Sequence, residues 1–139
     1  MAKGDDIEER LLAFAASVLD LCEHFPRTFA VSHIGKQLLR SATSAAPNYA
    51  EAGGCESRND FIHKLGIVLK ELNESRAWLK ILGTRKSALA AASRPLHKEC
   101  DELCRIIAVS RRTAIPAPSQ SGALPPPIYR NPPSHSGGW

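Results

Sequence analysis

Apolar residues recur at alternating spacings of four and three between Ser57 and Gly83. This periodicity places them on one face of a helix and does not fit the strict alternation of a strand. The stripe comprises Phe61, Leu65, Val68, Leu72, Leu79 and Leu82, with the small polar Ser75 at one position. A second apolar set widens the buried face and comprises Ile62, Leu69, Trp78 and Ile81. We therefore expect a helix that packs against more than one neighbour, with Ser57 as its N-cap and Leu72 in the core.

Three other segments show the same kind of periodicity. The expected helices span residues 5–24, 29–52, 58–82 and 94–112. Thr28 is a plausible cap for the second helix, and Gly53-Gly54 is expected to end it in a left-handed conformation. Ser93 is the predicted cap of the fourth helix, which puts Pro95 in the first turn, where its missing N–H is harmless. The predicted fold is all-α, an antiparallel up-down four-helix bundle over residues 1–112.

The composition changes sharply after residue 112. Seven of the ten prolines lie beyond this point, together with a single charged residue, Arg130. Such a segment buries too little apolar surface to offset the entropy lost on ordering. We therefore expect residues 113–139 to form a disordered tail rich in proline, serine and glycine.

The stretch SATSAAPNYAEAGG, residues 41–54, puts a proline inside the second predicted helix. An interior proline lacks the backbone N–H that a helix needs at that point. The small neighbours suggest that another helix approaches closely here. Two interpretations stay open. Either Pro47 kinks the helix and leaves Asn48 and Glu51 to engage freed backbone groups or basic partners, or the helix tolerates the proline.

Charge is unevenly distributed along the chain. Residues 1–26 carry two basic and six acidic side chains, whereas residues 27–139 carry sixteen basic and eight acidic ones. The contrast fits helix faces that complement each other within or between subunits, and it also fits a basic surface for RNA or DNA. The candidate nucleic-acid-binding residues are Arg40, Arg58, Lys64, Lys70, Arg76, Lys80, Arg85, Lys86, Arg105, Arg111 and Arg112. The cations are not interleaved with aromatic residues, so we expect weak sequence specificity.

The sequence offers little for catalysis or metal binding. A di-metal bundle site needs Glu-x-x-His, but the nearest match is a single Asp60-x-x-His63. Cys100 and Cys104 share a helix face near His97, yet the knuckle spacing of structural zinc sites is absent. No nucleophile elbow or phosphate-cradling glycine loop occurs. We therefore expect no enzyme activity, no metal and no cofactor, with the cysteines as reduced thiols.

The sequence also lacks an apolar run of about 18 residues, so we expect no membrane span. Its N-terminal stretch has no apolar signal core, which predicts a cytoplasmic protein.

Residues Gln37 to Leu82 resemble the bacterial four-helix bundle family, which is also called the 23S ribosomal RNA intervening-sequence protein family. Matching positions comprise Arg40, Ser41, Ser44, Asn48, Glu51, Phe61, Lys64, Leu65, Glu71, Glu74, Trp78 and Leu79. The resemblance implies a helical bundle that assembles into a ring-shaped homopentamer. The chain is also similar to the accessory variability determinant of diversity-generating retroelements, a basic pentamer that works with a reverse transcriptase and nucleic acid.

Two functional hypotheses follow. The first is a non-enzymatic oligomeric bundle that serves as a nucleic-acid or ribonucleoprotein accessory. The second is a structural or protein-partner module without a nucleic-acid role, in which the charges serve subunit contacts. The residues expected to form buried polar pairs or subunit contacts are Arg40, Asn48, Glu51, Glu71 and Glu74.

Overall fold

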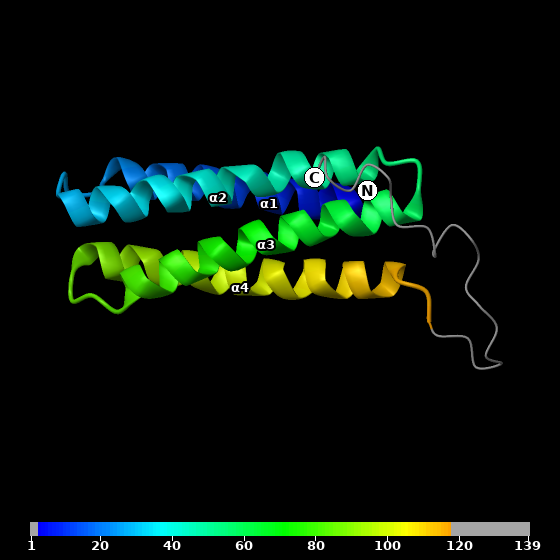
Figure 1. The fold of residues 1–139 in the computed structure, drawn as a ribbon. Coiled ribbons are helices and arrows are strands. Elements are labelled where there is room, and N and C mark those ends of the chain that lie inside the picture. Colours follow the sequence, from blue (N-terminus) through cyan, green and yellow to red (C-terminus); the bar gives the residue numbers. More distant parts are fainter. Residues whose placement is uncertain (1–2, 118–139) are drawn as a thin grey trace.

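The computed structural model describes residues 3–117 of the 139-residue chain. This range contains the helices α1 (Lys3–Glu23), α2 (Phe29–Gly53), α3 (Arg58–Gly83) and α4 (Ala88–Ala114), and no strand. Successive helices run in opposite directions and are joined by short loops (Figure 1). The predicted all-α, up-down bundle is confirmed. The expected disordered tail falls almost wholly on residues 118–139, outside the described residues.

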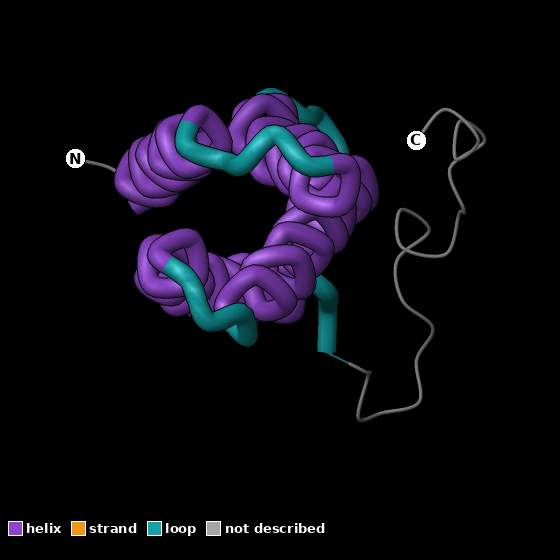
Figure 2. Tube along the Cα trace, turned by 90° about the vertical axis from the view of Figure 1, so that its left-hand side faces the viewer, coloured by secondary structure: helices purple, strands orange, loops and turns teal. Residues whose placement is uncertain are grey.

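Each helix packs against two others, so that the four form a ring in the order α1, α2, α3, α4. The end-on view in Figure 2 shows the helices around a common centre. Contact between α1 and α4, which closes the ring, is the least extensive of the four. Of the residues predicted to widen the buried face of α3, Leu69 and Trp78 pack partly buried against the core, whereas Ile81 is 49% exposed, so the prediction is wrong for Ile81.

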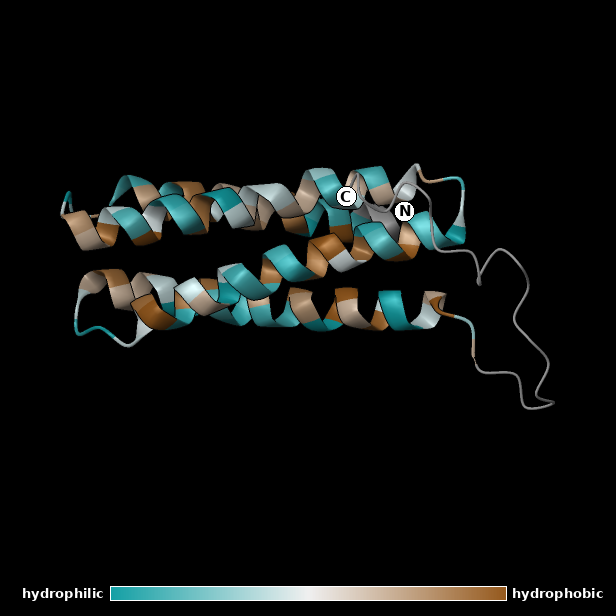
Figure 3. Ribbon diagram, in the orientation of Figure 1, coloured by the Kyte–Doolittle hydropathy of each residue, from teal (hydrophilic) through white to brown (hydrophobic). Residues whose placement is uncertain are grey.

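The core lies along the bundle axis and is built from the predicted stripes. Its largest fully buried side chains include Phe14, Leu11, Leu38, Leu65, Leu72, Leu79, Leu82, Leu103 and Ile107. On α2 the buried positions are mostly small, with Ser41, Ala42, Ala45 and Ala46. Each helix alternates between hydrophilic and hydrophobic residues along its length, as amphipathic helices do (Figure 3).

The second helix passes through Pro47 without interruption, and the proline lies on the exposed side. Asn48 Nδ2 donates to the Ser44 carbonyl oxygen at 2.9 Å, one turn back. Thr28 Oγ1 accepts from the N–H of Val31, so its predicted capping role is confirmed. The helix ends at Gly53, but Gly54 has φ −96°, which corrects the expected left-handed cap.

The predicted start of the fourth helix is wrong. α4 begins at Ala88, with Ser87 as its N-cap, and Ser93 is buried inside the helix. The first turns are alanine-rich, and alanine has the highest helix propensity. Ser93 Oγ donates to the Leu89 carbonyl oxygen at 2.7 Å, so its hydroxyl is satisfied within the helix. Pro95 consequently lies in the helix interior, and α4 also continues past the predicted end at residue 112.

Candidate nucleic-acid interface

The residues of the second and third helices that carry the family resemblance meet along a polar seam between α2 and α3. Ser41 Oγ and Ser75 Oγ are 2.7 Å apart in the buried part of this seam. Ser44 Oγ donates to Glu71 Oε2 at 2.9 Å. Near one end of the seam, Lys64 Nζ forms an ion pair with Glu51 Oε1 at 2.6 Å. The seam therefore fixes the register of the two helices.

Arg40 bridges the two acids of α3 within the same seam. It forms an ion pair with Glu71 at 3.5 Å and a closer one with Glu74. Partial burial raises the pKa of Glu74, but hydrogen bonds from Arg40 and Trp78 outweigh this effect and hold that pKa below its usual range. Arg40 keeps a side-chain exposure of 53%, so this predicted pairing lies at the surface rather than in the core.

Other cations that were predicted to contact nucleic acid are also paired with carboxylates of the same chain. Asp101 forms ion pairs with Arg76 at 2.9 Å and with Arg105 at 2.5 Å. The hydrogen bond from Arg76 is the main reason that the pKa of Asp101 is lowered. Arg10 links α1 to α4 by ion pairs with Glu99 and Glu102. These cations are largely neutralised within the bundle and contribute less to an external anion-binding surface.

Two further candidates are bound to backbone carbonyls. Arg58 Nη1 donates to the Ala114 carbonyl oxygen at 3.3 Å, near the end of α4. Arg111 Nε donates to the Ile62 carbonyl oxygen at 3.2 Å, and its side chain lies over Gly66. Both arginines therefore help to hold α3 and α4 together.

The remaining candidates make no hydrogen bond or ion pair within the described part of the chain. They are Lys70, Lys80, Arg85, Lys86 and Arg112. Three of the five, Lys80, Arg85 and Lys86, cluster where α3 ends and α4 begins. The antiparallel fold brings Arg27 and Lys36 to the same end of the bundle (Figure 1).

We call this surface the basic end and define it by Arg27, Lys36, Lys80, Arg85, Lys86 and Arg94. The carboxylates that α1 contributes there are Asp20 and Glu23. Arg27, Lys36 and Arg94 were not among the predicted candidates. Only the antiparallel arrangement of the helices places Arg27 and Lys36 at the end of the bundle where residues 80–86 lie.

The basic end also carries aromatic rings, one of them exposed. Phe29, the first residue of α2, is 89% exposed. One turn along, the His33 ring meets the Trp78 ring edge-on, with centroids 6.4 Å apart. Phe29 follows Arg27 by two positions and Trp78 precedes Lys80 by two, and the packing of α2 on α3 brings these two segments to the same end of the bundle.

The cysteines and acids do not gather into a metal site in the described residues. Cys100 and Cys104 lie in the hydrophobic core, and Cys100 Sγ donates to the Leu72 carbonyl oxygen at 3.1 Å. The hydrogen bond with Cys104, together with burial, raises the pKa of Cys100. All four cysteines are free thiols in the structure.

The sequence pattern of the 23S rRNA-intervening sequence proteins matches residues 6–109, a range that reaches from α1 into α4. The chain belongs to this family. It is similar to a crystal structure of a protein of unknown function from the S23 ribosomal protein family of Bacteroides thetaiotaomicron. The two share 29% sequence identity with a TM-score of 0.71, over 80% of this chain and 99% of the other.

No curated protein sequence matches the chain. Within residues 3–117, none of the family member's helices is both long and apolar enough to cross a membrane.

Proposed function

We propose that this family member is a non-enzymatic, oligomeric bundle that binds single-stranded nucleic acid, above all RNA, as an accessory of a ribonucleoprotein. The observation that carries the proposal is the basic end, where cations that form no ion pair among residues 3–117 lie at the same end of the bundle as an exposed phenylalanine. Phosphates are attracted by such cations, and unstacked bases pack on aromatic faces. The name of the family, which refers to an intervening sequence of 23S rRNA, supports RNA as the first choice.

Salt dependence is the first test of this function. Binding of a fluorescent single-stranded RNA is measured by anisotropy as the salt concentration is raised. We expect the association constant to fall linearly on a log–log plot, because each neutralised phosphate releases counterions. Absence of RNA and DNA binding at about 50 mM salt would reject the proposal, since non-specific binding is strongest at low salt.

A matched pair of double variants locates the surface. Arg85→Gln with Lys86→Gln removes two cations from the basic end, whereas Lys70→Gln with Arg112→Gln removes two from elsewhere. We expect the first pair to reduce both the affinity and the salt slope, and the second to have a smaller effect. Phe29→Ala should weaken the binding of single-stranded RNA more than that of duplex RNA, because bases in a duplex cannot stack on the ring. Equal losses of RNA affinity in both double variants would argue against the basic end as the binding surface.

Assembly is the second part of the proposal. Glu9, Leu12, Ala16, Leu19 and Glu23 follow each other along one exposed face of α1 at helical spacing. Leu12 is 54% and Leu19 is 49% exposed, which fits an apolar strip that a second copy of the chain covers. Acidic residues at its ends would suit a basic face of that copy, and head-to-tail contacts of this kind form a ring where the rotation between copies closes.

The family resemblance makes a homopentamer the expected size and a reverse transcriptase a candidate partner. A cytoplasmic setting follows from the proposed RNA ligand. Sedimentation at low and high salt, with the ratio of absorbance at 260 and 280 nm recorded, measures both assembly and co-purified nucleic acid. A chain that stays monomeric at every concentration would reject the proposed assembly.

A protein-partner module without a nucleic-acid role is the second candidate, and the many internal ion pairs of the predicted cations favour it. Arg40, Lys64, Arg76 and Arg105 all bind carboxylates of their own chain. Recovery of a stoichiometric protein partner after nuclease treatment, together with failure to bind RNA, would support this function over the first.

A further inference from the structure

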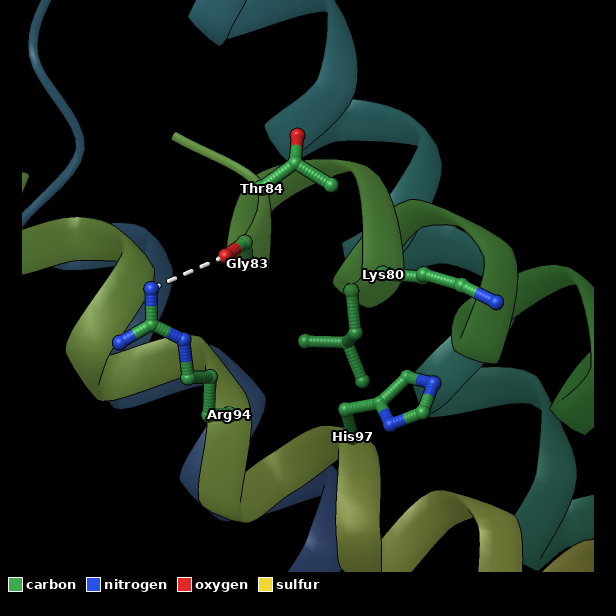
Figure 4. Close-up of a pocket in the computed structure, with 6 residues that line it drawn as sticks. Lys80, Gly83, Thr84, Arg94 and His97 are labelled. Atoms are coloured by element: carbon green, nitrogen blue, oxygen red, sulfur yellow. Dashed lines mark hydrogen bonds between the residues drawn. The ribbon is translucent and has the colours of Figure 1, made fainter. Parts of the chain in front are cut away.

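A small pocket at the basic end lies between the last turn of α3 and the first half of α4. Its volume is about 210 Å³, and it is lined by Leu79, Lys80, Gly83, Thr84, Arg94 and His97. Arg94 and His97 are three residues apart on α4 and thus project from the same side of the helix. Figure 4 shows Arg94 reaching the backbone of Gly83, with His97 beneath the last turn of α3.

The lining contains three nitrogen-bearing side chains and no carboxylate. One Nη of Arg94 donates to the Gly83 carbonyl oxygen at 3.1 Å. This bond holds the guanidinium at the pocket edge, while a guanidinium has five N–H donors in total. Lys80 and His97 donate no hydrogen bond to any described residue. The pocket therefore keeps several donors available for an anion.

The surroundings add to the positive potential. Arg85 and Lys86 stand in the loop directly after α3. Glu99, two residues after His97, is paired with Arg10 of α1, and Asp101, one turn beyond His97, is paired with Arg76 and Arg105. The lining of the pocket itself contains no carboxylate, and the two carboxylates that follow His97 most closely along α4 are engaged by arginines of the same chain.

We propose that this pocket binds a single phosphate group, held by Lys80 and His97, with Arg94 at the pocket edge. Its volume lies below the range of about 300–1,000 Å³ that is typical of pockets for drug-sized ligands, so it suits one phosphate with little else attached. Arginine and lysine both bind phosphate well, the first through its planar fork and the second as a point charge. The phosphate is either the terminal phosphate of an RNA strand, which rests on the proposed function, or free inorganic phosphate.

The first experiment uses the full chain and inorganic phosphate. Amide and side-chain N–H resonances are followed by NMR during a phosphate titration in phosphate-free buffer at constant ionic strength. We expect saturable shifts at Gly83, Thr84 and the Arg94 side chain, with smaller shifts elsewhere. Lys80→Gln and His97→Gln should each weaken phosphate binding about tenfold, the effect of losing one charge-assisted hydrogen bond.

Controls separate the pocket from general charge and from folding. Arg112→Gln removes one cation far from the pocket and should leave phosphate affinity within about twofold. Arg94→Gln also breaks the bond to Gly83, so its folding is checked by circular dichroism. Lys80 makes no internal bond, so Lys80→Gln keeps the test decisive if Arg94→Gln unfolds. Chemical shifts that do not saturate would overturn the proposal that the pocket binds phosphate. Equal phosphate affinities of Lys80→Gln and Arg112→Gln would overturn it as well.

The second experiment distinguishes the source of the phosphate. Two RNA oligonucleotides of one sequence, with a phosphate or a hydroxyl at the 5′ end, compete for the wild-type chain and for His97→Gln. A preference for the phosphorylated RNA that His97→Gln abolishes supports a strand end as the ligand. Saturable phosphate binding without that preference supports free phosphate instead. RNA binding that is intact in every pocket variant, with no phosphate binding, rejects the pocket but leaves the proposed function standing.

Discussion

Ser41 Oγ lies 2.7 Å from Ser75 Oγ at a point where both residues are fully buried between α2 and α3. Each hydroxyl also reaches a backbone carbonyl of its own helix, at Leu38 and Glu71. This pair lets two helices touch with small polar groups where larger residues would hold them apart.

The serine pair should tolerate alanine better than a larger residue. Ser75→Ala is expected to cost about 1 kcal/mol, because the Ser41 hydroxyl keeps its backbone acceptor. Ser75→Leu should cost about 1–3 kcal/mol or more, since the added volume separates the helices. Urea unfolding measures both values. A Ser75→Leu variant as stable as the wild type would contradict the close approach of α2 and α3.

Leu72 is completely buried in the core, whereas Leu12 is 54% exposed. Leu72→Ala should lower the free energy of unfolding by about 2–5 kcal/mol, through lost burial and the cavity left behind. Leu12→Ala is the matched control and should change it by no more than about 0.5 kcal/mol in dilute monomer. A loss below about 1 kcal/mol for Leu72→Ala would mean that the core packs differently.

Acid should weaken the polar seam through Glu74, whose pKa is lowered in the folded chain. A carboxyl with a lowered folded-state pKa stabilises above its unfolded value, about 4.3 for glutamate. That contribution is lost as the pH falls through the folded pKa. Unfolding free energy measured between about pH 6 and pH 3 should therefore decline less in Glu74→Gln than in the wild type.

The control for the acid series is Glu56→Gln, which alters an exposed glutamate in the loop between α2 and α3. It should follow the wild-type curve. A Glu74→Gln curve parallel to the wild type would show that the ion pair with Arg40 adds nothing to folding.

Gly35 and Gly53 of the same helix should respond in opposite directions to alanine. A Cβ at Gly35 would lie 2.7 Å from Phe25 Cδ2, whereas one at Gly53 would meet nothing within 4 Å. Gly35→Ala should destabilise by about 1–3 kcal/mol, because the Phe25 ring must move. Gly53→Ala should be neutral or stabilise by up to about 1 kcal/mol through helix propensity. Thermal unfolding compares the two, and combining Gly35→Ala with Phe25→Ala should recover part of the loss.

The cysteines should react with a thiol reagent in a defined order. Cys100 and Cys104 are buried in the core, whereas Cys22 and Cys55 are partly accessible. Burial raises the pKa of both Cys22 and Cys55, so even these thiols should react more slowly than a free thiol of ordinary pKa. We expect mass spectrometry to find labels on Cys55 and Cys22 first, and on the other two only in urea. Early labelling of Cys100 would indicate that α4 detaches readily.

Much of the fold was predictable because helix periodicity is a local property. The predicted stripe on α3 is buried from Leu65 to Leu82, although its first residue, Phe61, is only half-buried, and the predicted cap Ser57 is confirmed. The start of α4 was mispredicted because Ser93 and Pro95 form a convincing local cap signal. The alanine-rich turns before them form a helix nonetheless, with Ala90 buried in the bundle.

The candidate site was predictable only in part. The sequence identified Lys80, Arg85 and Lys86 as candidate nucleic-acid contacts, and the predicted helix over residues 58–82 placed them near one helix end. It could not show that Arg40 and Arg76 are neutralised, because their acidic partners Glu74 and Asp101 are selected by helix packing. It also could not bring Phe29 to the same end as Lys80, since they are 51 positions apart in the chain.

The sequence by itself determined the helical class, the buried stripes and the excess of positive charge after the first helix. These follow from residue spacing and composition, which act within one or two turns. Only the tertiary structure decided which cations remain available to a ligand. Charge pairing depends on distances between α2, α3 and α4, and those distances are set by the small residues at 41–46 and by the packing of Leu72 and its neighbours. The basic end and its pocket are products of that packing.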